Sequence, residues 1–368
     1  MAARSSRSSS SVTAIAIISS ERYSGKSSLA VGLALELRDR GLSVGYMKPV
    51  GSYPIKVDDK RVDEDAYFVK EALGLTDSLS DMTPFFLTWE TLKRYMRKRP
   101  GNPRATVKRC YERLSTGKDI MLLEGAHNFI HGRILGLSSL ELSGLLDAGL
   151  LLLDTFDEDL TTDRILSAGD YFGDIFLGVV LNWVPERRRS FVENQLSRFL
   201  EEQGISLFGS LPTDRVLRSI SVNDLAEALD GQIICAPGER EELVESMMVG
   251  AMGQEQALRL FRERSNKVVV TGGDRPDIQL AALQTPTKSL ILTGGRRPTP
   301  QVIGQAEEMR VPIILVNHDT ATTAEMVEAA MGRQKVHGPE KIDRIRGFIR
   351  EHLDLDALLA KAEDSEPR

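Results

Sequence analysis

The chain has 368 residues, of which 41% are hydrophobic and 27% are charged, and its formal net charge is −6. This length is too great for one ordinary single-core domain and suits two globular domains. The negative charge argues against a protein dedicated to binding nucleic acid or anionic membranes. The two cysteines exclude a disulfide scaffold and a tetrathiolate zinc site, so we expect a reduced, cytoplasmic protein.

The first eleven residues, MAARSSRSSSS, are polar and rich in serine. A segment with so few apolar side chains cannot bury enough surface to offset its chain entropy, so we predict that residues 1–11 are a disordered tail. The apolar run that follows, VTAIAII, is far shorter than the roughly 20 residues of a membrane span. It leads into a glycine–lysine loop rather than into the cleavage site of a signal peptide, which predicts a buried strand.

Short apolar runs alternate with longer amphipathic segments across residues 12–212. Runs that are apolar on both faces are typical of a parallel sheet covered by helices. The alternation therefore predicts an α/β fold, a doubly wound parallel sheet with right-handed crossovers. The predicted strands are Val12–Ile18, Ser43–Met47, Ile120–Leu123, Leu150–Leu153 and Ile175–Leu181, and the predicted helices are Ser27–Asp39, Glu64–Leu73, Trp89–Lys98, Thr106–Ser115, Leu160–Tyr171 and Arg188–Gln203.

A second, smaller α/β domain is predicted over residues 217–332, followed by a helical tail over residues 333–368. The run KVVVTGG at Lys267–Gly273 has an echo, SLILTGG, at Ser289–Gly295. Two such runs are too few for a solenoid and indicate neighbouring strands of one sheet. Other predicted elements are a helix at Val222–Leu229, a strand at Gln232–Cys235, a helix at Gln301–Met309, a strand at Val311–Asn317, and one or two helices within Pro339–Ala362.

Two interpretations of these glycine pairs stay open. Paired glycines before a helix can bind an anion through backbone N–H groups, with Arg275 and Arg296 supplying positive charge. Tight turns between strand and helix can require glycine without any ligand.

The densest basic stretch is KRYMRKR, at residues 93–99. In a chain with a negative net charge this stretch favours a solvated helix face over a contact with phosphate groups. We therefore expect no nucleic-acid partner and no membrane association.

The segment SERYSGKS, residues 20–27, lies between a predicted strand and a predicted helix, as a Walker A phosphate loop requires. Backbone N–H groups at a helix N-terminus form a positive nest for phosphates. We expect Lys26 to reach the β- and γ-phosphates of ATP and Ser27 to bind Mg²⁺. Ser20 replaces the first glycine of the GxxxxGK[ST] pattern, and Glu21 stands where partitioning ATPases carry an additional lysine. The predicted nucleotide-binding residues of the loop are Ser20, Ser24, Gly25, Lys26, Ser27 and Ser28.

Charged residues follow other predicted strands at the carboxyl edge of the sheet, where open α/β sheets bind ligands. Lys48 begins the turn KPVGS and is predicted to hold an anionic substrate group, although a solvent-exposed lysine beside a turn proline is the alternative. Glu124 ends the apolar strand IMLLE, where a carboxylate is costly to bury without a partner. Asp65 opens a helix, a place that the helix dipole alone favours for an acid. Because carboxylates suit Mg²⁺, we predict Asp65 and Glu124 as magnesium ligands.

The order SGKS…YMKPVGS…DEDA…LLEGA…LNWVP resembles the dethiobiotin synthetase (BioD-like) family of P-loop ligases over residues 12–212. The resemblance implies that Lys26 and Lys48 are the catalytic lysines and that Ser52 lies beside the transferred group. It also implies that Asn182 contacts the adenine base. The implied magnesium ligands are Ser27, Asp65 and Glu124.

The chain departs from that family after Glu124-Gly125-Ala126. His127, Asn128 and Phe129 follow, where the synthetases carry more glycine. These larger side chains are expected to reshape or close the amine site. The departure argues for nucleotide and magnesium binding and against the ligase reaction.

The stretch VVVTGGDRPDIQLAAL in the second domain resembles the DRTGG domain. The pair of domains is similar to the amino-terminal, non-catalytic part of long phosphotransacetylases and to stand-alone proteins named cobyrinic acid a,c-diamide synthase-like. Because a phosphotransacetylase catalytic domain needs roughly 300 further residues, acetyl transfer by these residues alone is not expected. The resemblance also implies a homodimer.

We therefore predict a protein that binds Mg·ATP on its P-loop domain and senses a small ligand or a partner enzyme through its DRTGG-like domain. Slow ATP hydrolysis would be compatible with this role. The alternative is an ATP-dependent ligase of the dethiobiotin synthetase or cobyrinic acid a,c-diamide synthase type.

Overall fold

The apolar runs of the first 212 residues form a parallel sheet in the computed structural model, which describes residues 12–98, 101–332 and 339–364. The strand order is β10-β9-β8-β1-β7-β2, and every neighbouring pair is parallel. The doubly wound α/β fold is confirmed. The disordered tail predicted for residues 1–11 lies outside the described residues.

The six strands of this sheet are β1 (Thr13–Ile18), β2 (Val44–Met47), β7 (Ile120–Glu124), β8 (Ala148–Thr155), β9 (Phe176–Val184) and β10 (Leu207–Pro212). Two small pairings lie beside it, β3 (Val50–Gly51) with β6 (Phe85–Phe86), and β4 (Pro54–Val57) with β5 (Lys60–Asp63). The helices are α1 (Lys26–Asp39), α2 (Glu64–Leu73), α3 (Leu79–Met82), α4 (Trp89–Arg97), α5 (Pro103–Ser115), α6 (Ser139–Leu146), α7 (Thr161–Phe172), α8 (Glu186–Phe191) and α9 (Ser197–Glu202).

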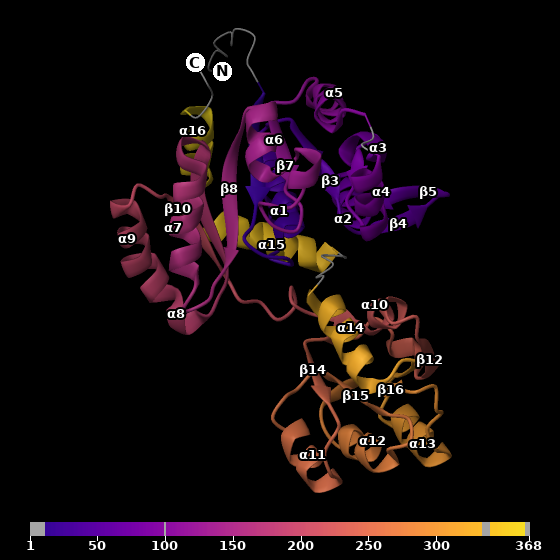
Figure 1. Ribbon diagram of the computed structural model, residues 1–368. Helices are drawn as coiled ribbons and strands as arrows, with labels where there is room; N and C mark the ends of the chain where they lie inside the picture. The colour runs from indigo at the N-terminus through magenta and orange to yellow at the C-terminus, as the bar shows by residue number, and fades with distance from the viewer. Residues whose placement is uncertain (1–11, 99–100, 333–338, 365–368) are drawn as a thin grey trace. The chain divides into compact units, whose positions relative to one another are not determined.

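Strand order decides which face of the sheet each helix covers. The chain passes from β1 to β2 in one direction along the sheet and then returns through β7, β8, β9 and β10 in the other. With right-handed crossovers, α1 lies on one face and α5, α6 and α7 lie on the opposite face (Figure 1). The first 213 residues therefore leave β9 and β10 uncovered on the face of the sheet where α1 lies.

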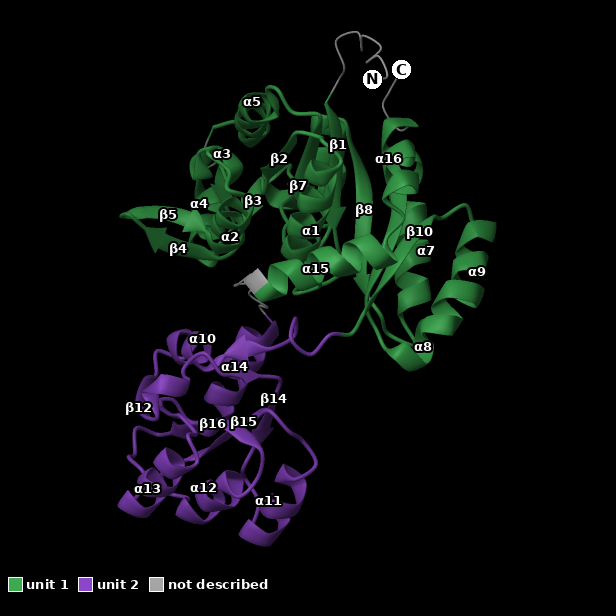
Figure 2. Ribbon diagram, turned by 180° about the vertical axis from the view of Figure 1, so that it is seen from behind, with its two compact units in different colours: residues 1–213, 337–368 green, residues 214–336 purple. Residues whose placement is uncertain are grey.

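The C-terminal helices α15 (Pro339–His352) and α16 (Leu355–Asp364) cover that face. Helix α15 packs along α1, where Ile345 and Ile349 lie against Gly32 so closely that a Cβ there would approach them to 2.6–2.7 Å. Helix α16 packs against β1, β9 and β10. The first compact unit consequently consists of residues 1–213 and 337–368 (Figure 2).

Residues 214–336 form the second compact unit. Its sheet has the order β12-β17-β16-β15-β14, with β12 antiparallel to β17 and the other pairs parallel. One face of this sheet packs on α10 and α14, and the other packs on α11, α12 and α13. The principal elements are α10 (Val222–Ala228), β12 (Gln232–Cys235), β14 (Ser246–Val249), α11 (Gln254–Phe261), β15 (Lys267–Gly272), α12 (Pro276–Leu283), β16 (Thr287–Thr293), α13 (Pro300–Glu308), β17 (Ile313–Leu315) and α14 (Thr320–Gly332), and β11 (Ile220–Ser221) pairs with β13 (Leu243–Val244).

In the part of the chain that the structure describes, no helix combines the length and apolar character that a membrane span needs. The basic helix α4 buries none of its side chains and exposes Trp89 and Met96. It is thus the solvated helix face expected of the basic stretch, whose last residue, Arg99, lies outside the described residues.

Candidate nucleotide-binding site

The loop between β1 and α1 has the geometry of a phosphate loop. Gly25 adopts a left-handed backbone conformation, with φ +96°, immediately before α1 begins at Lys26. A Cβ at Gly25 would approach Asn182 Nδ2 to 2.7 Å, so both its conformation and its surroundings require glycine. The loop therefore ends at a helix N-terminus, where backbone N–H groups favour an anion.

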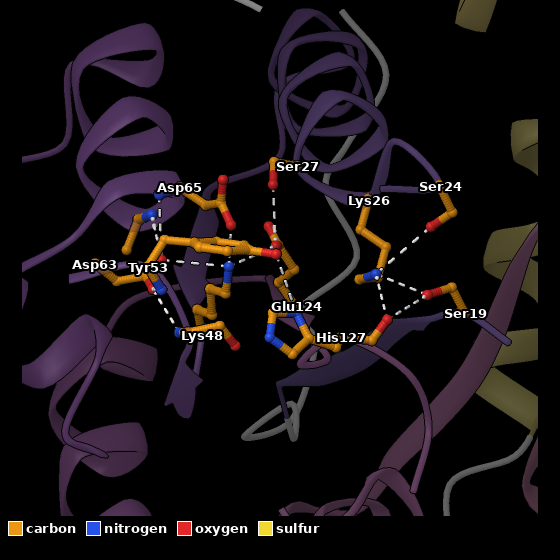
Figure 3. Close-up of polar contacts among 12 residues, drawn as sticks. Ser19, Ser24, Lys26, Ser27, Lys48, Tyr53, Asp63, Asp65, Glu124 and His127 are labelled. Carbon is orange, nitrogen blue, oxygen red and sulfur yellow. Dashed lines mark hydrogen bonds and ion pairs between the residues drawn. The ribbon is translucent and has the colours of Figure 1, made fainter. Parts of the chain in front are cut away.

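The side chain of Lys26 is buried and points back over this loop (Figure 3). Its Nζ donates to Ser19 Oγ at 2.7 Å, to the His127 carbonyl at 3.4 Å and to Ser24 Oγ at 3.5 Å. Burial is the main reason that the pKa of Lys26 falls to about 8, and the nearby Lys48 ammonium acts in the same direction. All three of these partners are neutral, so the ammonium is available to an anionic ligand.

A cluster of charged side chains lies at the carboxyl ends of β2 and β7. Lys48 is buried, with its Nζ 3.1 Å from Glu124 Oε1 and 3.3 Å from Asp63 Oδ1, and it also pairs with Asp65 (Figure 3). Burial alone would lower the pKa of Lys48, but these three carboxylates raise it well above its usual value. Lys48 is thus a charged, internally neutralised lysine rather than a solvent-exposed one.

Glu124 joins this cluster to the phosphate loop. Its Oε1 accepts from Ser27 Oγ at 3.0 Å, and its Oε2 accepts from the Tyr46 hydroxyl at 2.8 Å. Burial raises the pKa of the Glu124 carboxyl, and the Lys48 ammonium opposes that rise. The structure therefore brings Ser27 and the two predicted acids around one position, which the Lys48 ammonium shares.

The oxygens at this position fit a magnesium ion. Ser27 offers a hydroxyl and both Asp65 and Glu124 offer carboxylates, which are the ligand types that a hard divalent cation prefers. Among the described residues, no group of three or more His, Cys, Asp or Glu side chains could hold a metal ion. Mg²⁺ is usually bound by one or two carboxylates and completes its shell with phosphate oxygens and water.

Asp63 is a central residue of the cluster that the sequence analysis did not select. Its Oδ1 caps α2 by accepting from the amides of Asp65 and Ala66, at 3.1 and 3.2 Å. Its Oδ2 accepts from the amides of Ser52 and Tyr53, at 2.9 and 3.2 Å. One fully buried carboxylate thus holds the loop after Lys48 against the start of α2.

Aromatic rings lie beside the cluster. Tyr23 stacks on Tyr53 with ring centroids 6.2 Å apart, Tyr53 lies 5.1 Å from His127, and His127 lies 4.8 Å from His131. Burial, with the nearby His131 and Arg22, lowers the pKa of His127 to about 3, so its imidazole is neutral at pH 7. The side chain that departs from the synthetase pattern is therefore packed into the site wall.

Ser20, Ser28, Ser52 and Asn182 are the remaining predicted site residues. Ser20 Oγ donates to Asp154 at the carboxyl end of β8, and Ser28 is half-buried in the first turn of α1. Asn182 Nδ2 donates to the Ser24 carbonyl at 2.8 Å, so this amide braces the phosphate loop. Ser52 Oγ is buried and has no hydrogen-bond partner.

The sequence analysis also did not predict Tyr46, Arg164 and Asp154 as site residues. The local sequence indicates some of these residues better than others. Tyr46 places a hydroxyl in an otherwise apolar, fully buried strand, which by itself indicates a polar partner. Asp63 directly precedes α2, a position where Asp is a favoured cap. Arg164 and Asp154 carried no signal, because their approach to the loop depends on how β8 and α7 pack beside β1.

Three amides of the glycine loops in the second unit are already hydrogen-bonded within the protein. Gly273 N donates to the Thr293 carbonyl at 3.2 Å, and Gly294 N and Gly295 N donate to the carbonyls of His318 and Val316, both at 2.9 Å. These contacts favour the second interpretation of the glycine pairs, in which glycine serves tight turns.

The family comparisons agree with this geometry. Residues 13–221, more than half of the chain, match the family described as AAA domain. The chain belongs to the AAA-domain family. Residues 224–330 match the DRTGG domain, so the AAA domain of this chain is followed by a DRTGG domain, as the sequence predicts.

Two of the curated relatives match most of this AAA-domain protein, and a third matches a shorter part of it. A phosphate acetyltransferase of Deinococcus radiodurans is 27% identical over 92% of this chain and 49% of its own length. A phosphate acetyltransferase of Nitrosomonas europaea is 24% identical over 92% of this chain and 50% of its own. The ATP-dependent dethiobiotin synthetase BioD of Brachyspira hyodysenteriae is 28% identical over 29% of this chain and 47% of its own. The chain spans about half the length of the phosphate acetyltransferases that it matches.

Proposed function

We propose that this protein binds a magnesium–nucleotide complex, ATP above all, at the loop between β1 and α1. The observation that carries the proposal is the convergence at this loop of a buried lysine, Lys26, and of Ser27 beside Glu124. The lysine would neutralise the phosphate chain, while Ser27, Asp65 and Glu124 would hold Mg²⁺. A bound Mg²⁺ would neutralise charge on the phosphates.

The role of nucleotide binding is, in this proposal, regulatory rather than synthetic. Lys48, which a ligase would need for its anionic substrate, pairs with Asp63, a carboxylate outside the proposed magnesium site, as well as with Asp65 and Glu124. The rings of Tyr53 and His127 pack against each other beside the same cluster, and His127 stands in the segment where the synthetases carry more glycine. Both features reduce the room and the charge available for a carbamate or an amine.

We further propose that the DRTGG domain senses a small ligand or a partner enzyme and conveys its state to the nucleotide site. The relatives that match over most of this chain are named phosphate acetyltransferases, so such an enzyme activity is one candidate partner. A ligase reaction of the dethiobiotin synthetase type stays the alternative. It is favoured by Ser52 Oγ, a buried hydroxyl without a partner beside the Lys48 turn.

Replacing Lys26 by alanine is expected to abolish the stabilisation of the protein by Mg·ATP. A ligand present at 100 times its dissociation constant stabilises the native state by about 2.7 kcal/mol, and this gain should appear as a higher melting temperature of the unaltered chain. The measurement is thermal unfolding with and without about 5 mM Mg·ATP, which is 100 times the dissociation constant of a site with a Kd of about 50 μM. Lys108→Ala, an exposed lysine on α5, serves as the control and should keep the full shift. An equal shift in Lys26→Ala would reject the site.

Replacing Glu124 by glutamine is expected to remove most of the magnesium dependence of nucleotide binding. Glutamine has nearly the same shape but no charge, so it is a poor ligand for a hard cation. ATP affinity of the unaltered chain, measured by calorimetry, should fall about 10-fold or more when EDTA replaces Mg²⁺, equivalent to about 1.4 kcal/mol. The same exchange should change the affinity of Glu124→Gln by less than about 3-fold. Glu112→Gln, on the exposed face of α5, is the matched control.

A further inference from the structure

Two acids lie next to the phosphate loop, where a bound nucleotide would place negative charge. Asp154, at the carboxyl end of β8, is fully buried and accepts a hydrogen bond from Ser20 Oγ. Glu21 is the next residue of the loop and is half-buried. In a site of low dielectric, carboxylates close to a phosphate chain weaken its binding unless a cation offsets them.

Arg164, in the first turn of α7, approaches both acids. Its Nε lies 3.1 Å from Asp154 Oδ2, and its Nη1 lies 3.6 Å from Glu21 Oε2. Its Nη2 donates to the Thr155 carbonyl at 2.9 Å, which fixes the guanidinium at the end of β8. A cation from a helix far along the chain therefore reaches Glu21 of the phosphate loop and the acid that accepts from Ser20.

The contact of Arg164 with Asp154 is a buried ion pair. Arg164 Nε and Asp154 Oδ2 are both buried and lie 3.1 Å apart. At this distance the guanidinium offsets the charge of the carboxylate. Arg164 therefore acts on the surroundings of the loop through its charge.

The charge on Asp154 persists near neutral pH. Burial, together with the nearby Glu21, raises the pKa of Asp154 to about 6, although the Ser20 hydroxyl and the Arg164 guanidinium oppose the rise. At pH 7 and above the carboxylate is mostly ionised, so its negative charge must be balanced when phosphates bind.

We propose that Arg164 is the charge-balancing residue of the phosphate loop, which offsets Asp154 and Glu21 so that the loop can accept a polyphosphate. This proposal rests on the proposed nucleotide binding and adds a positioning residue to it. Glu21 stands where partitioning ATPases carry an additional lysine in the loop itself, and here the extra cation comes instead from α7. The ligand class that needs such balancing is a nucleoside di- or triphosphate, because its charge is concentrated at the loop.

The test measures how the affinity of Arg164→Gln depends on phosphate charge. Calorimetry at pH 8 with Mg·ATP, Mg·ADP and AMP should show a loss of about 10- to 100-fold for ATP, since one charge-assisted contact is worth about that much. The loss should be smaller for ADP and less than about 3-fold for AMP. The double variant Arg164→Gln/Asp154→Asn should recover at least half of the lost factor for ATP on a logarithmic scale, because it removes one of the acids.

Arg198→Gln is the matched control, since Arg198 is an exposed arginine paired with Glu202 on α9. It loses the same charge and should bind all three nucleotides as the unaltered chain does. Equal losses for ATP and AMP, or no recovery in the double variant, would overturn the charge-balancing role. If the unaltered chain binds Mg·ATP and Arg164→Gln binds it equally well, only this inference fails. If the unaltered chain binds no nucleotide, the proposed function fails and the inference falls with it.

Discussion

Asp63→Ala is expected to destabilise the first unit by about 3–5 kcal/mol and to prevent Mg·ATP binding. The substitution removes the acceptor of the amides of Ser52, Tyr53, Asp65 and Ala66. A buried amide left without a partner costs about 1–3 kcal/mol, and the cost is lower for the three amides here that are only partly buried. It also leaves the buried Lys48 with one carboxylate fewer. Urea unfolding followed by tryptophan fluorescence measures the effect, because both tryptophans, Trp89 and Trp183, belong to the first unit.

Asp63→Asn separates the two contributions of this side chain. Asparagine keeps an oxygen that can cap α2, so this variant should lose less stability than the alanine variant, by at least about 1 kcal/mol. Asp163→Ala removes an exposed carboxylate from the first turn of α7 and should change stability by less than about 0.5 kcal/mol. A change below about 1 kcal/mol for Asp63→Ala would show that the carboxylate does not hold the loop.

Ending the chain after residue 336 is expected to destabilise the first unit by about 5 kcal/mol or more. The truncation uncovers α1 and removes the buried side chains of Ile345, Ile349, Leu355 and Leu358, each worth about 1.5–3 kcal/mol when fully buried. The same fluorescence measurement should show a lower urea midpoint or an unfolded first unit. An unchanged midpoint would mean that α15 and α16 do not stabilise the sheet.

A milder pair of substitutions tests the polar part of this contact. Glu36, buried on α1, lies 2.9 Å from Arg346 Nε and 2.7 Å from Arg350 Nη2. Arg346→Ala/Arg350→Ala leaves this carboxylate unpaired and should cost about 2 kcal/mol, less than a fully buried pair because both arginines are partly exposed. Adding Glu36→Gln should restore about half of the loss. Arg198→Ala, which breaks an exposed pair with Glu202 on α9, is the control and should have little effect.

The strands of the first sheet were predictable where they are fully apolar. The runs that became β1, β2, β7, β8 and β9 were found to within a few residues, because a central parallel strand is apolar on both faces. The edge strand β10 was missed, since Leu207–Pro212 contains glycine and proline and pairs on one side with β9 only. The hairpin of β4 and β5 was missed as well, because its half-exposed residues carry no continuous apolar pattern.

Helix boundaries depended on similar local signals. The predicted helix Arg188–Gln203 begins two residues earlier, at Glu186, and contains a wider turn at Val192–Leu196 between α8 and α9. Helix α6 was not predicted at all. Its residues SLELSGLL follow a glycine-rich loop without a long amphipathic pattern, although a capping box at Ser138 and Glu141 marks its start.

The candidate site was predictable in position but only partly in its contacts. Lys26, Ser27, Lys48 and Glu124 were selected because each follows or ends a parallel strand, and the carboxyl ends of parallel strands share one edge of the sheet. Asp65 was selected because it opens a helix, and the structure brings it to the same edge. This rule predicts which residues lie close together, but it does not predict which of their atoms form hydrogen bonds and ion pairs. The engagement of Lys48 by three carboxylates became visible only once the side chains were placed.

The sequence by itself thus determined the two-domain α/β architecture and the phosphate loop, because local patterns of apolar runs and turn residues predict both. Tertiary structure alone decided that the C-terminal helices return to the first unit, because that depends on which face of the sheet the crossovers leave open. It also decided that Asp63 ties the Lys48 loop to α2 and that Arg164 reaches the phosphate loop. Such contacts depend on distances between side chains far apart in the chain, and no local pattern encodes those distances.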